Sequence, residues 1–339
     1  MTVSADHGRT GGQITGPVLV TGAAGFIGSH VAEHLLNAGV DVVGIDNFDP
    51  MYDVGLKRAN IRDVQRTAPA GGARFHFHEC DLNDTATLSG VLDATRPRGV
   101  IHLAAKAGVR PSILDPVGYC TANVTATAAL LGHAQRLGCD RFVMASSSSV
   151  YGNSLSVPFS ESHDVSMPIS PYAATKKACE LIGHTHWHLT RMPVACLRFF
   201  TVYGPRQRPD LAIQMFMMRI ARDEQIPVFG EGTSRDYTYI DDIVHGVIAA
   251  YRRIPELGFR VWNLGSDHPV GLDEMIDTIA RTVGRPADIV RKPMQPGDVM
   301  RTWADLSLVR ADLGYRPSTD FASGVARQWE WNVGRQATA

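Results

Sequence analysis

A glycine-rich turn between a strand and a helix constrains this chain more than any other feature of its sequence. Residues 17–21 (Pro-Val-Leu-Val-Thr) are an apolar run that predicts a buried strand, and a Gly-x-x-Gly-x-x-Gly motif at residues 22–28 follows it directly. A helical pattern continues to Leu36, and a second apolar run at residues 40–46 predicts another strand, which ends at Asp46. This order of strand, glycine turn, helix, strand and acid is typical of a dinucleotide-binding βαβ unit.

The chemistry of a dinucleotide explains why these residue types stand in this order. The glycines permit a tight turn and let the backbone approach a pyrophosphate, while the helix N-terminus offers unpaired N–H groups and the positive end of its dipole. The Asp46 carboxylate can accept hydrogen bonds from the adenosine ribose, and its charge repels a 2′-phosphate. The pattern therefore predicts NAD rather than NADP as the cofactor.

Strand and helix patterns continue to alternate through the N-terminal part of the chain. Further strands are expected at residues 74–78, 100–103, 142–146 and 194–199. Helical patterns separate them at residues 84–94, 118–137 and 171–190. Such alternation predicts an α/β fold with a Rossmann-type, doubly wound parallel sheet, on which ligands bind at the carboxyl ends of the strands.

The pattern loosens after residue 200, which predicts a smaller C-terminal lobe beside the sheet. The expected division is an NAD-binding domain at residues 17–200, to which residues 238–266 return, a substrate-binding lobe at 201–237 and 267–335, and a disordered tail at 1–16. A cleft between the two lobes is the expected ligand site.

Composition and charge exclude several other classes of protein. The net charge of −1 gives no electrostatic basis for binding nucleic acid or an anionic membrane, and no apolar run is long enough to span a bilayer. Residues 1–16 lack the apolar core of a signal peptide. The five cysteines are scattered without a Cys-x-x-Cys pair, which favours reduced thiols in a cytoplasmic protein.

Tyr172 and Lys176 lie four residues apart in the predicted helix at 171–190, so both side chains project from one face. A free phenol is a weak base at neutral pH, and a nearby ammonium favours the phenolate form through charge and hydrogen bonding. Such a tyrosine can take a proton from a sugar hydroxyl. The same spacing also occurs by chance on helix surfaces, where a lysine stem covers a tyrosine ring.

Three features occur together: the glycine motif at residues 22–28, four serines at 146–149 followed by Val-Tyr-Gly, and the tyrosine–lysine pair. In combination they resemble the extended short-chain dehydrogenase/reductase family, whose members modify nucleotide sugars, over nearly the whole chain. The resemblance implies that Tyr172 is the base, that Lys176 holds the nicotinamide ribose and favours the phenolate, and that Ser149 hydrogen-bonds the sugar 4-hydroxyl.

The cofactor site expected from the glycine motif, the strand ends and the resemblance lies along one edge of the sheet. Asn123 matches a structural position of the family near this site. The expected cofactor-binding residues are Gly22, Gly25, Phe26, Ile27, Gly28, Asp46, Asn47, Asp81, Leu82, Leu103, Ala104, Ala105, Lys106, Asn123, Ser147, Tyr172 and Lys176.

The resemblance implies a reaction at C4 of a UDP-sugar. Tyr172 would remove the 4-hydroxyl proton, directly or through Ser149, while the C4 hydride passes to NAD; its return to the other face of the 4-ketone inverts C4. In the family, 4,6-dehydratases carry Asp-Glu immediately before Val-Tyr-Gly, and decarboxylases that make UDP-xylose carry Glu at the second position. This chain has Ser148 and Ser149 there, which leaves epimerisation, an isomerase reaction.

The substrate is predicted from residues 208–212 (Arg-Pro-Asp-Leu-Ala), which are similar to the Arg-Pro-Asp-Met-Ala of UDP-glucuronate 4-epimerases. Residues 198–205 resemble a segment of UDP-glucose 4-epimerases that usually has Asn where this chain has Thr201. In a UDP-glucuronate 4-epimerase, Thr201 and Arg208 would hold the C5 carboxylate. A 4-keto uronate is a β-keto acid that loses CO2 when its carboxylate stands perpendicular to the carbonyl plane, and these contacts would prevent that geometry. The expected conversion is UDP-glucuronate to UDP-galacturonate. The alternatives are a UDP-glucose 4-epimerase and, from another class, a non-catalytic dinucleotide sensor.

The remaining expectations concern the substrate, the subunits and metals. The substrate-binding residues implied by the resemblance are Ser148, Ser149, Thr201, Arg208, Arg235 and Asp298. Arg301 is a further candidate because it lies near the Gly-Asp-Val turn, whereas the arginine of the family in this region would fall at Gln295. The helices at 118–137 and 171–190 correspond to a pair that forms a homodimer in the family, so a homodimer is expected. No metal site is expected, because His184 and His188 share a helix face without an acid to complete a site.

Overall fold

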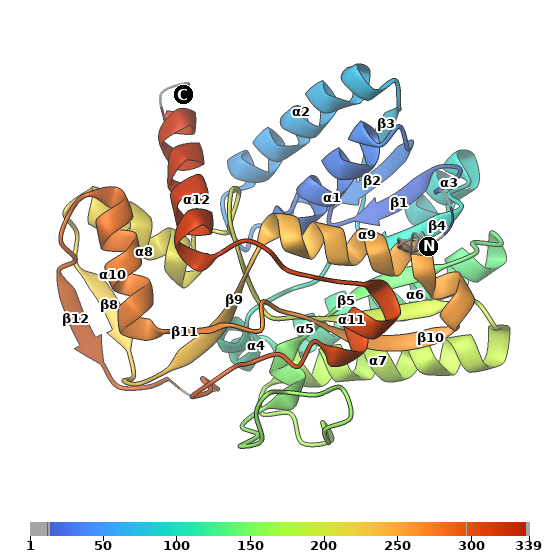
Figure 1. Ribbon diagram of the computed structural model, residues 1–339. Helices are drawn as coiled ribbons and strands as arrows, with labels where there is room; N and C mark the ends of the chain where they lie inside the picture. Colours follow the sequence, from blue (N-terminus) through green and yellow to red (C-terminus); the bar gives the residue numbers. More distant parts are fainter. Residues whose placement is uncertain (1–11, 13, 296, 337–339) are drawn as a thin grey trace, which may run out of the picture.

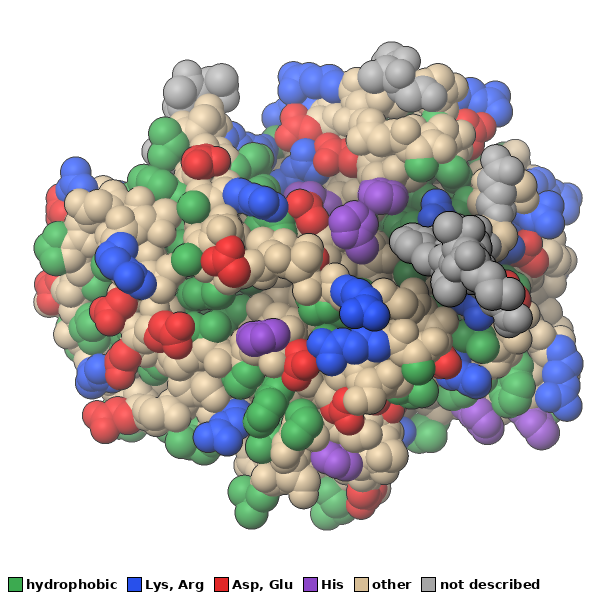
Figure 2. Space-filling model, viewed as in Figure 1, with side chains coloured by type: hydrophobic (Ala, Val, Ile, Leu, Met, Phe, Trp, Pro, Cys, Tyr) green, Lys and Arg blue, Asp and Glu red, His purple; other side chains and the backbone are tan. Residues whose placement is uncertain are grey.

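The computed structural model of the protein describes residues 12, 14–295 and 297–336. Most of the tail predicted at residues 1–16 therefore lies outside the described residues. None of the described helices is both long enough and apolar enough to cross a membrane. On the face shown in Figure 2, acidic and basic side chains are interspersed, in keeping with the net charge of −1.

A seven-stranded parallel sheet forms the centre of the larger part of the molecule (Figure 1). Its strands are β1 (Val18–Thr21), β2 (Val42–Asp46), β3 (Phe75–Glu79), β4 (Gly99–His102), β5 (Phe142–Ser147), β6 (Val194–Phe199) and β10 (Phe259–Leu264). They lie in the order β10-β6-β5-β4-β1-β2-β3, so the chain reverses its direction of progress between β1 and β4. The prediction of a doubly wound α/β fold is confirmed.

Helices cover both faces of this sheet. One face carries α1 (Phe26–Asn37), α2 (Val54–Gly71) and α9 (Ile240–Leu257). The other carries α3 (Thr85–Thr95), α6 (Ala126–Arg136) and α7 (Pro171–Thr190). Because the inner strands are covered on both sides, β1, β2, β4 and β6 are buried along their whole length, whereas the edge strand β3 alternates between Phe and His and is partly exposed.

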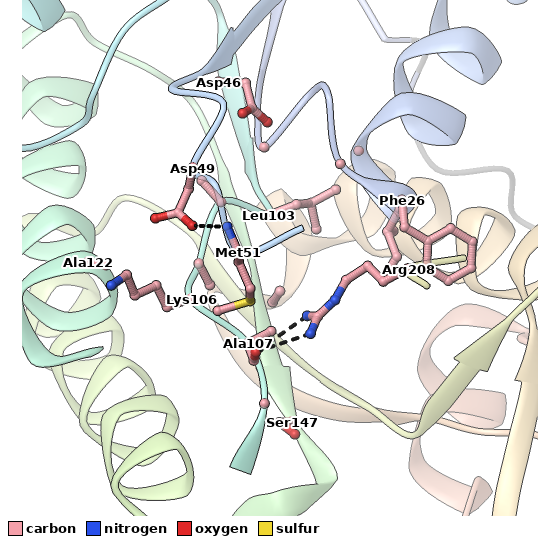
Figure 3. A pocket seen from close by; sticks show the side chains of 18 of the residues that line it. Phe26, Asp46, Asp49, Met51, Leu103, Lys106, Ala107, Ala122, Ser147 and Arg208 are labelled. Atoms are coloured by element: carbon pink, nitrogen blue, oxygen red, sulfur yellow. Dashed lines mark hydrogen bonds between the residues drawn. The ribbon is translucent and has the colours of Figure 1, made fainter. Parts of the chain in front are cut away.

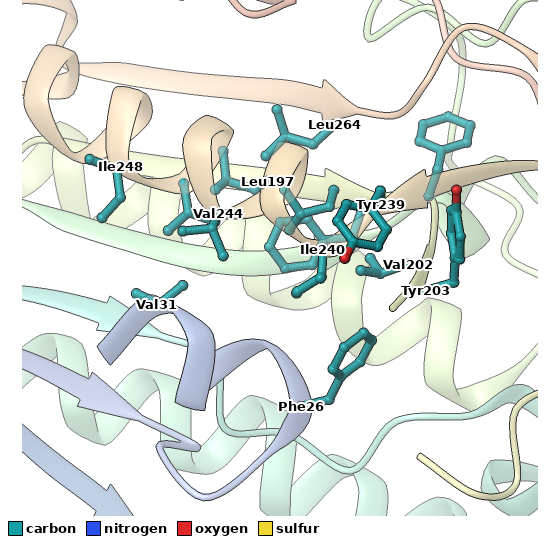
Figure 4. Close-up of a cluster of buried hydrophobic side chains, with 14 of the residues drawn as sticks. Phe26, Val31, Leu197, Val202, Tyr203, Tyr239, Ile240, Val244, Ile248 and Leu264 are labelled. Atoms are coloured by element: carbon teal, nitrogen blue, oxygen red, sulfur yellow. The ribbon is translucent and has the colours of Figure 1, made fainter. Parts of the chain in front are cut away.

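Two apolar cores result, one on each face of the sheet. Val20 belongs to the core beneath α1 and α9, and its neighbour Leu19 to the core beneath α3 and α6. Figure 4 shows the first core, with Val31 of α1 facing Val244 and Ile248 of α9. Full burial of each such side chain contributes about 1.5–3 kcal/mol. This packing fixes α1, and the glycine turn that precedes it, against the sheet.

The helix predicted at residues 118–137 is divided into three segments. They are α5 (Pro116–Tyr119), the π-helical turn η1 (Cys120–Thr125) and α6. Local π turns within helices often mark functional sites. Here η1 contains Asn123, whose buried amide oxygen accepts a hydrogen bond from the Lys106 N–H at 2.8 Å and so ties the helix to the loop after β4.

In the described part of the chain, the smaller lobe consists of short sheets flanked by helices. Its strands are β7 (Thr201–Tyr203), β9 (Ser234–Tyr239) and β11 (Pro269–Gly271), with β8 (Ile226–Phe229) and β12 (Ile289–Lys292) as a separate pair. Its helices are α8 (Ala212–Ala221), α10 (Leu272–Val283) and α12 (Phe321–Gln336). Helix α11 (Ser307–Leu313), which the sequence assigns to this lobe, packs instead against α9 and β10 of the larger part.

Candidate active site

A cavity of about 400 Å³ lies at the carboxyl ends of the central strands. It extends from the glycine turn at the start of α1 to Arg208 in the loop after β7 (Figure 3). The expected cofactor-binding residues that line it are Gly22, Gly25, Phe26, Ile27, Gly28, Asp46, Asn47, Asp81, Leu82, Leu103, Ala104, Ala105, Lys106, Ser147, Tyr172 and Lys176. Asn123 is buried behind the wall and does not line the cavity.

The glycine turn is packed so closely against backbone atoms that it has no room for a larger residue at Gly22 or Gly28. Gly22 has a φ of +70°, and a Cβ added there would lie 2.8 Å from the Ala104 nitrogen. A Cβ on Gly28 would lie 2.0 Å from the Gly22 carbonyl oxygen. Gly25 precedes α1 without providing a side-chain cap, so N–H groups of the first turn remain available to an anion. This arrangement fits the pyrophosphate of a dinucleotide.

Acidic side chains line the end of the cavity beside β2 and β3. The Asp46 carboxylate accepts hydrogen bonds from the Ala24 N–H at 3.1 Å and the Phe48 N–H at 2.8 Å, which fix its orientation. Burial raises the pKa of Asp46, and the nearby Lys57 ammonium opposes this shift. Asp81 accepts a hydrogen bond from the Asn47 amide at 2.9 Å. These acceptors lie where the sequence predicts the adenosine ribose.

Tyr172 and Lys176 lie in the first turns of α7, where this helix borders the cavity. Ser170 caps the helix by accepting a hydrogen bond from the Ala173 N–H at 3.1 Å. The Lys176 ammonium donates to the Ala145 carbonyl oxygen at 2.8 Å and lies 6.0 Å from the centre of the Tyr172 ring. The two side chains therefore share one cavity with the glycine turn.

Ser149 lies in the 3-10 turn η2 (Ser148–Tyr151), which directly follows β5. The Ser149 N–H donates to Ser147 Oγ at 3.1 Å, and Ser147 Oγ donates to Ser149 Oγ at 3.1 Å. Ser147 lines the first cavity, whereas Ser148 and Ser149 line a second cavity of about 150 Å³. Thr201 lines both cavities, so the two adjoin.

The second cavity contains two more of the predicted substrate residues, Arg235 and Asp298. The Arg235 guanidinium donates to a backbone carbonyl oxygen of β9 at 2.9 Å, and burial lowers its pKa. Asp298 forms an ion pair with Arg110 at 2.7 Å. Arg301 is exposed and lines neither cavity, so the structure does not place it with the other predicted substrate residues.

Arg208 points into the first cavity from the loop that follows β7 (Figure 3). Its guanidinium forms a two-point ion pair with the Asp210 carboxylate, with distances of 3.0 Å from Nε and 2.6 Å from Nη2. Both terminal nitrogens also lie 3.4 Å from the Ala107 carbonyl oxygen. Thr201 and Arg208 thus border the same cavity as Tyr172.

Sequence reasoning missed a buried network around His102, the last residue of β4. Its Nδ1 lies 2.7 Å from Thr21 Oγ1 and its Nε2 lies 3.0 Å from Thr127 Oγ1. Burial lowers the pKa of His102 to about 3, so the ring is neutral. Thr127 Oγ1 donates to the Asn123 carbonyl oxygen at 2.5 Å, which links β1, β4 and η1 behind the cavity. The available signal was Thr21 at the end of the first predicted strand and His102 within the predicted strand at 100–103.

The loop between β2 and α2 was also missed, although it contributes Asp49, Met51 and Tyr52 to the first cavity. Figure 3 shows Met51 lying close to Ala107 at the end of the cavity near Arg208. The available signal was Asp53, a typical helix N-cap, which accepts a hydrogen bond from the Gly55 N–H at 2.7 Å and fixes where the loop ends.

Among the residues that the structure describes, no group of three or more His, Cys, Asp and Glu side chains is arranged to hold a metal ion. The rings of His184 and His188 lie 6.4 Å apart on α7.

Comparison with known proteins gives a consistent assignment. The family model described as GDP-mannose 4,6 dehydratase matches residues 19–328. A probable UDP-glucuronate 4-epimerase of Rhizobium meliloti (strain 1021) is 40% identical over 331 residues, which cover 92% of this chain and 96% of the relative.

Solved structures resemble this chain over nearly its whole length. The crystal structure of UDP-glucuronic acid 4-epimerase from Bacillus cereus, in complex with UDP-glucuronic acid and NAD, has a TM-score of 0.86 and 36% identity, covering 94% of this chain and 99% of that one. The UDP-glucose 4-epimerase of Thermotoga maritima, with UDP-glucose, has a TM-score of 0.84 and 28% identity, covering 95% and 100%.

Proposed function

This chain belongs to the GDP-mannose 4,6 dehydratase family of extended short-chain dehydrogenases/reductases, and on that premise we propose that it is an isomerase, an NAD-dependent UDP-glucuronate 4-epimerase. The observation that carries the proposal is that Tyr172, Lys176 and Arg208 line one cavity with the glycine turn. A base, a dinucleotide cradle and a cation suited to a carboxylate thus meet at one place.

The residues present fit NAD. The glycine turn lines the cavity, the first turn of α1 has no side-chain cap on its N–H groups, and Asp46 presents a fixed carboxylate. Lys176 is held toward the cavity by the Ala145 carbonyl oxygen, in reach of a nicotinamide ribose. Bound NAD would supply a hydride acceptor at C4 of the sugar and return the same hydride.

Side chains of this protein remove and return the proton of the sugar 4-hydroxyl. Tyr172 takes the 4-hydroxyl proton as the C4 hydride leaves, and gives it back when the 4-ketone is reduced on its other face. The Lys176 ammonium lies on the same side of the helix, 6.0 Å from the centre of the Tyr172 ring. Ser149 holds the 4-hydroxyl from the adjoining cavity, next to Ser147, which lines the first.

A dehydratase reaction is disfavoured, although the family model has that description. Expulsion of the 6-hydroxyl requires an acid and a base at C5 and C6. The residues at the two positions before Val150 are Ser148 and Ser149, which cannot supply a carboxylate. The 4-ketone is therefore returned to an alcohol.

The uronate is favoured over a neutral hexose because of Thr201 and Arg208. The Arg208 guanidinium, 13% exposed, offers the planar fork that pairs with carboxylates, and Thr201 adds a hydroxyl where the two cavities adjoin. Held by both, the carboxylate of the 4-keto intermediate stays away from the perpendicular orientation that releases CO2.

Separate incubation with UDP-glucuronate and UDP-glucose, followed by NMR of the products, tests this function. We expect UDP-galacturonate from the first and little conversion of the second. Conversion of UDP-glucose alone would establish the UDP-glucose 4-epimerase that the Thermotoga maritima structure also suggests. If the protein binds NAD but converts neither sugar, the alternative of a non-catalytic dinucleotide sensor would be favoured.

We also infer that the protein is a homodimer of the cytoplasm. Leu114 of α4 (Val109–Leu114) is 88% exposed, Val117 of α5 is 76% exposed and Leu181 of α7 is 56% exposed, on helices that pack together. Such a surface is suited to a second copy of the chain. The five cysteines are free thiols, in keeping with a reducing compartment. A monomer mass in solution would contradict the dimer.

A further inference from the structure

Asp210 already forms an ion pair with the Arg208 guanidinium, which is the group proposed to bind the substrate carboxylate. Asp210 binds one edge of the guanidinium, the edge formed by Nε and Nη2, at 3.0 and 2.6 Å. This is the two-point geometry with which arginine recognises carboxylates in general. The side chain of Arg208 is 13% exposed, whereas that of Asp210 is 47% exposed.

The second edge of the guanidinium, formed by Nη1 and Nη2, faces the Ala107 carbonyl oxygen at 3.4 Å. That oxygen belongs to the backbone and also accepts a hydrogen bond from the Tyr119 hydroxyl at 3.2 Å. Its partial negative charge opposes the approach of a carboxylate from this side. A two-point carboxylate contact with Arg208 must therefore displace one of two acceptors, Ala107 or Asp210.

Asp210 is the acceptor that can move. In the part of the chain that the structure describes, both of its carboxylate oxygens bond to Arg208 and to no other side chain. It is a half-exposed side chain that can rotate into water, where its charge is solvated at little cost. The Ala107 carbonyl, in contrast, cannot turn away without moving the loop after β4.

We propose that Asp210 holds the Arg208 guanidinium in place until substrate binds, and then yields it to the C5 carboxylate of the substrate. The inference rests on the proposed uronate function. If both carboxylates remained on one guanidinium, two negative charges would lie side by side around a single cation, which is unfavourable. After the exchange, Arg208 still pairs with one carboxylate, that of the substrate in place of that of Asp210.

Two consequences follow for specificity. Asp210 neutralises a largely buried cation and keeps the Arg208 guanidinium aimed at the cavity. A ligand without a carboxylate leaves this pair intact and gains nothing from Arg208. A ligand with a carboxylate gains only the difference between two ion pairs, so its affinity is lower than an unopposed Arg208 would give.

Binding measurements on holoenzyme with NAD test the exchange. Tyr172→Phe serves as the background, because it is expected to bind sugar without turning it over. Adding Asp210→Asn should tighten the Kd of UDP-glucuronate by roughly three- to tenfold, the range expected from losing one half-exposed competing ion pair. The Kd of UDP-glucose should stay within about twofold, since that ligand does not contest Arg208.

Asp49→Asn is the matched control. Asp49 lines the same cavity and carries the same charge, but its carboxylate accepts a hydrogen bond from the Met51 N–H rather than from Arg208. This variant measures the general effect of removing one negative charge, which is expected to be smaller than that of Asp210→Asn because of solvent screening. Equal tightening by both variants would overturn the exchange, as would weaker UDP-glucuronate binding by Asp210→Asn.

Arg208→Ala separates this inference from the function on which it rests. We expect Arg208→Ala to weaken UDP-glucuronate, and Asp210→Asn to have no further effect when added to it. If Asp210→Asn still tightens binding without Arg208, the exchange is wrong while the carboxylate role of Arg208 stands. If Arg208→Ala leaves the Kd of UDP-glucuronate unchanged, the carboxylate role is itself wrong.

Discussion

The Glu180 carboxylate and the Arg198 guanidinium form a buried two-point ion pair, at 2.8 and 2.9 Å, that joins α7 to β6 beneath the site. Arg198 also donates to the Tyr151 hydroxyl at 2.9 Å, and Ser146 donates to Glu180 at 2.7 Å. Burial raises the pKa of Tyr151 to about 12, so this group remains a hydroxyl that donates to Asn263. The network connects the helix of Tyr172 to the turn of Ser149.

Glu180→Gln should be strongly destabilising, because it leaves the Arg198 charge buried without a counterion. Removing one partner of a buried pair costs about 3–5 kcal/mol. Denaturant unfolding of the variant and the parent measures the loss. The control Lys177→Ala removes a partly exposed neighbour of the same carboxylate and should cost less than about 1 kcal/mol. A loss for Glu180→Gln as small as that of the control would contradict the role of this pair.

Tyr172→Phe should retain NAD and lose about 10²- to 10⁴-fold in kcat, because the base is removed and the ring is kept. Tyr119→Phe is a matched control, since its ring contacts that of Tyr172 edge-on at 6.2 Å while its hydroxyl donates to a backbone carbonyl. Steady-state kinetics on UDP-glucuronate compare the two. Similar losses in both variants would mean that packing, and not the Tyr172 hydroxyl, is being measured.

Arg208→Ala should reduce kcat/KM for UDP-glucuronate by about ten- to a hundredfold, the value of a charge-assisted hydrogen bond, and should release some decarboxylated sugar. Arg301→Ala removes an exposed arginine that lines neither cavity and should have little effect. Product analysis by NMR detects the loss of CO2. Unchanged uronate kinetics in Arg208→Ala would reject its carboxylate role.

Acid should destabilise the fold through His102. Its folded pKa of about 3 lies below the ordinary value of 6.5, because of burial and then the Lys176 charge. The unfolded chain therefore binds more protons between pH 6.5 and 3, and stability falls as pH falls through this range, by up to about 1.4 kcal/mol per pH unit. The stability of the parent minus that of His102→Gln, measured from unfolding curves, should fall as the pH falls from 6.5 to 3, because only the parent has this histidine to protonate. A difference that stays constant over this range would contradict this.

The strands and the glycine turn could be predicted because their signals are local. An apolar run, a glycine motif and an acid are adjacent in sequence, and β1, α1 and β2 occur where expected. The shared face of Tyr172 and Lys176 likewise follows from helical spacing alone. Their roles, and those of the other site residues, remain predictions that the variants above examine.

The features that were missed depend on contacts between distant parts of the chain. Arg198 lies in an apolar strand, and only the fold shows that Glu180 neutralises it. The interruption of the helix at η1 follows from Asn123 bonding to the loop after β4, which no local pattern reveals. Arg301 was a candidate because it lies close in sequence to the Gly-Asp-Val turn, but the fold leaves it exposed.

The central claim is that C4 is inverted by removal and return of one hydride at a single site. Incubation with UDP-glucuronate carrying deuterium at C4, in ordinary water, tests it most directly, with the product examined by NMR and mass spectrometry. The account predicts UDP-galacturonate that retains the deuterium at C4. Product that has exchanged this deuterium for solvent hydrogen would contradict it, because the C4 hydrogen would then have left as a proton.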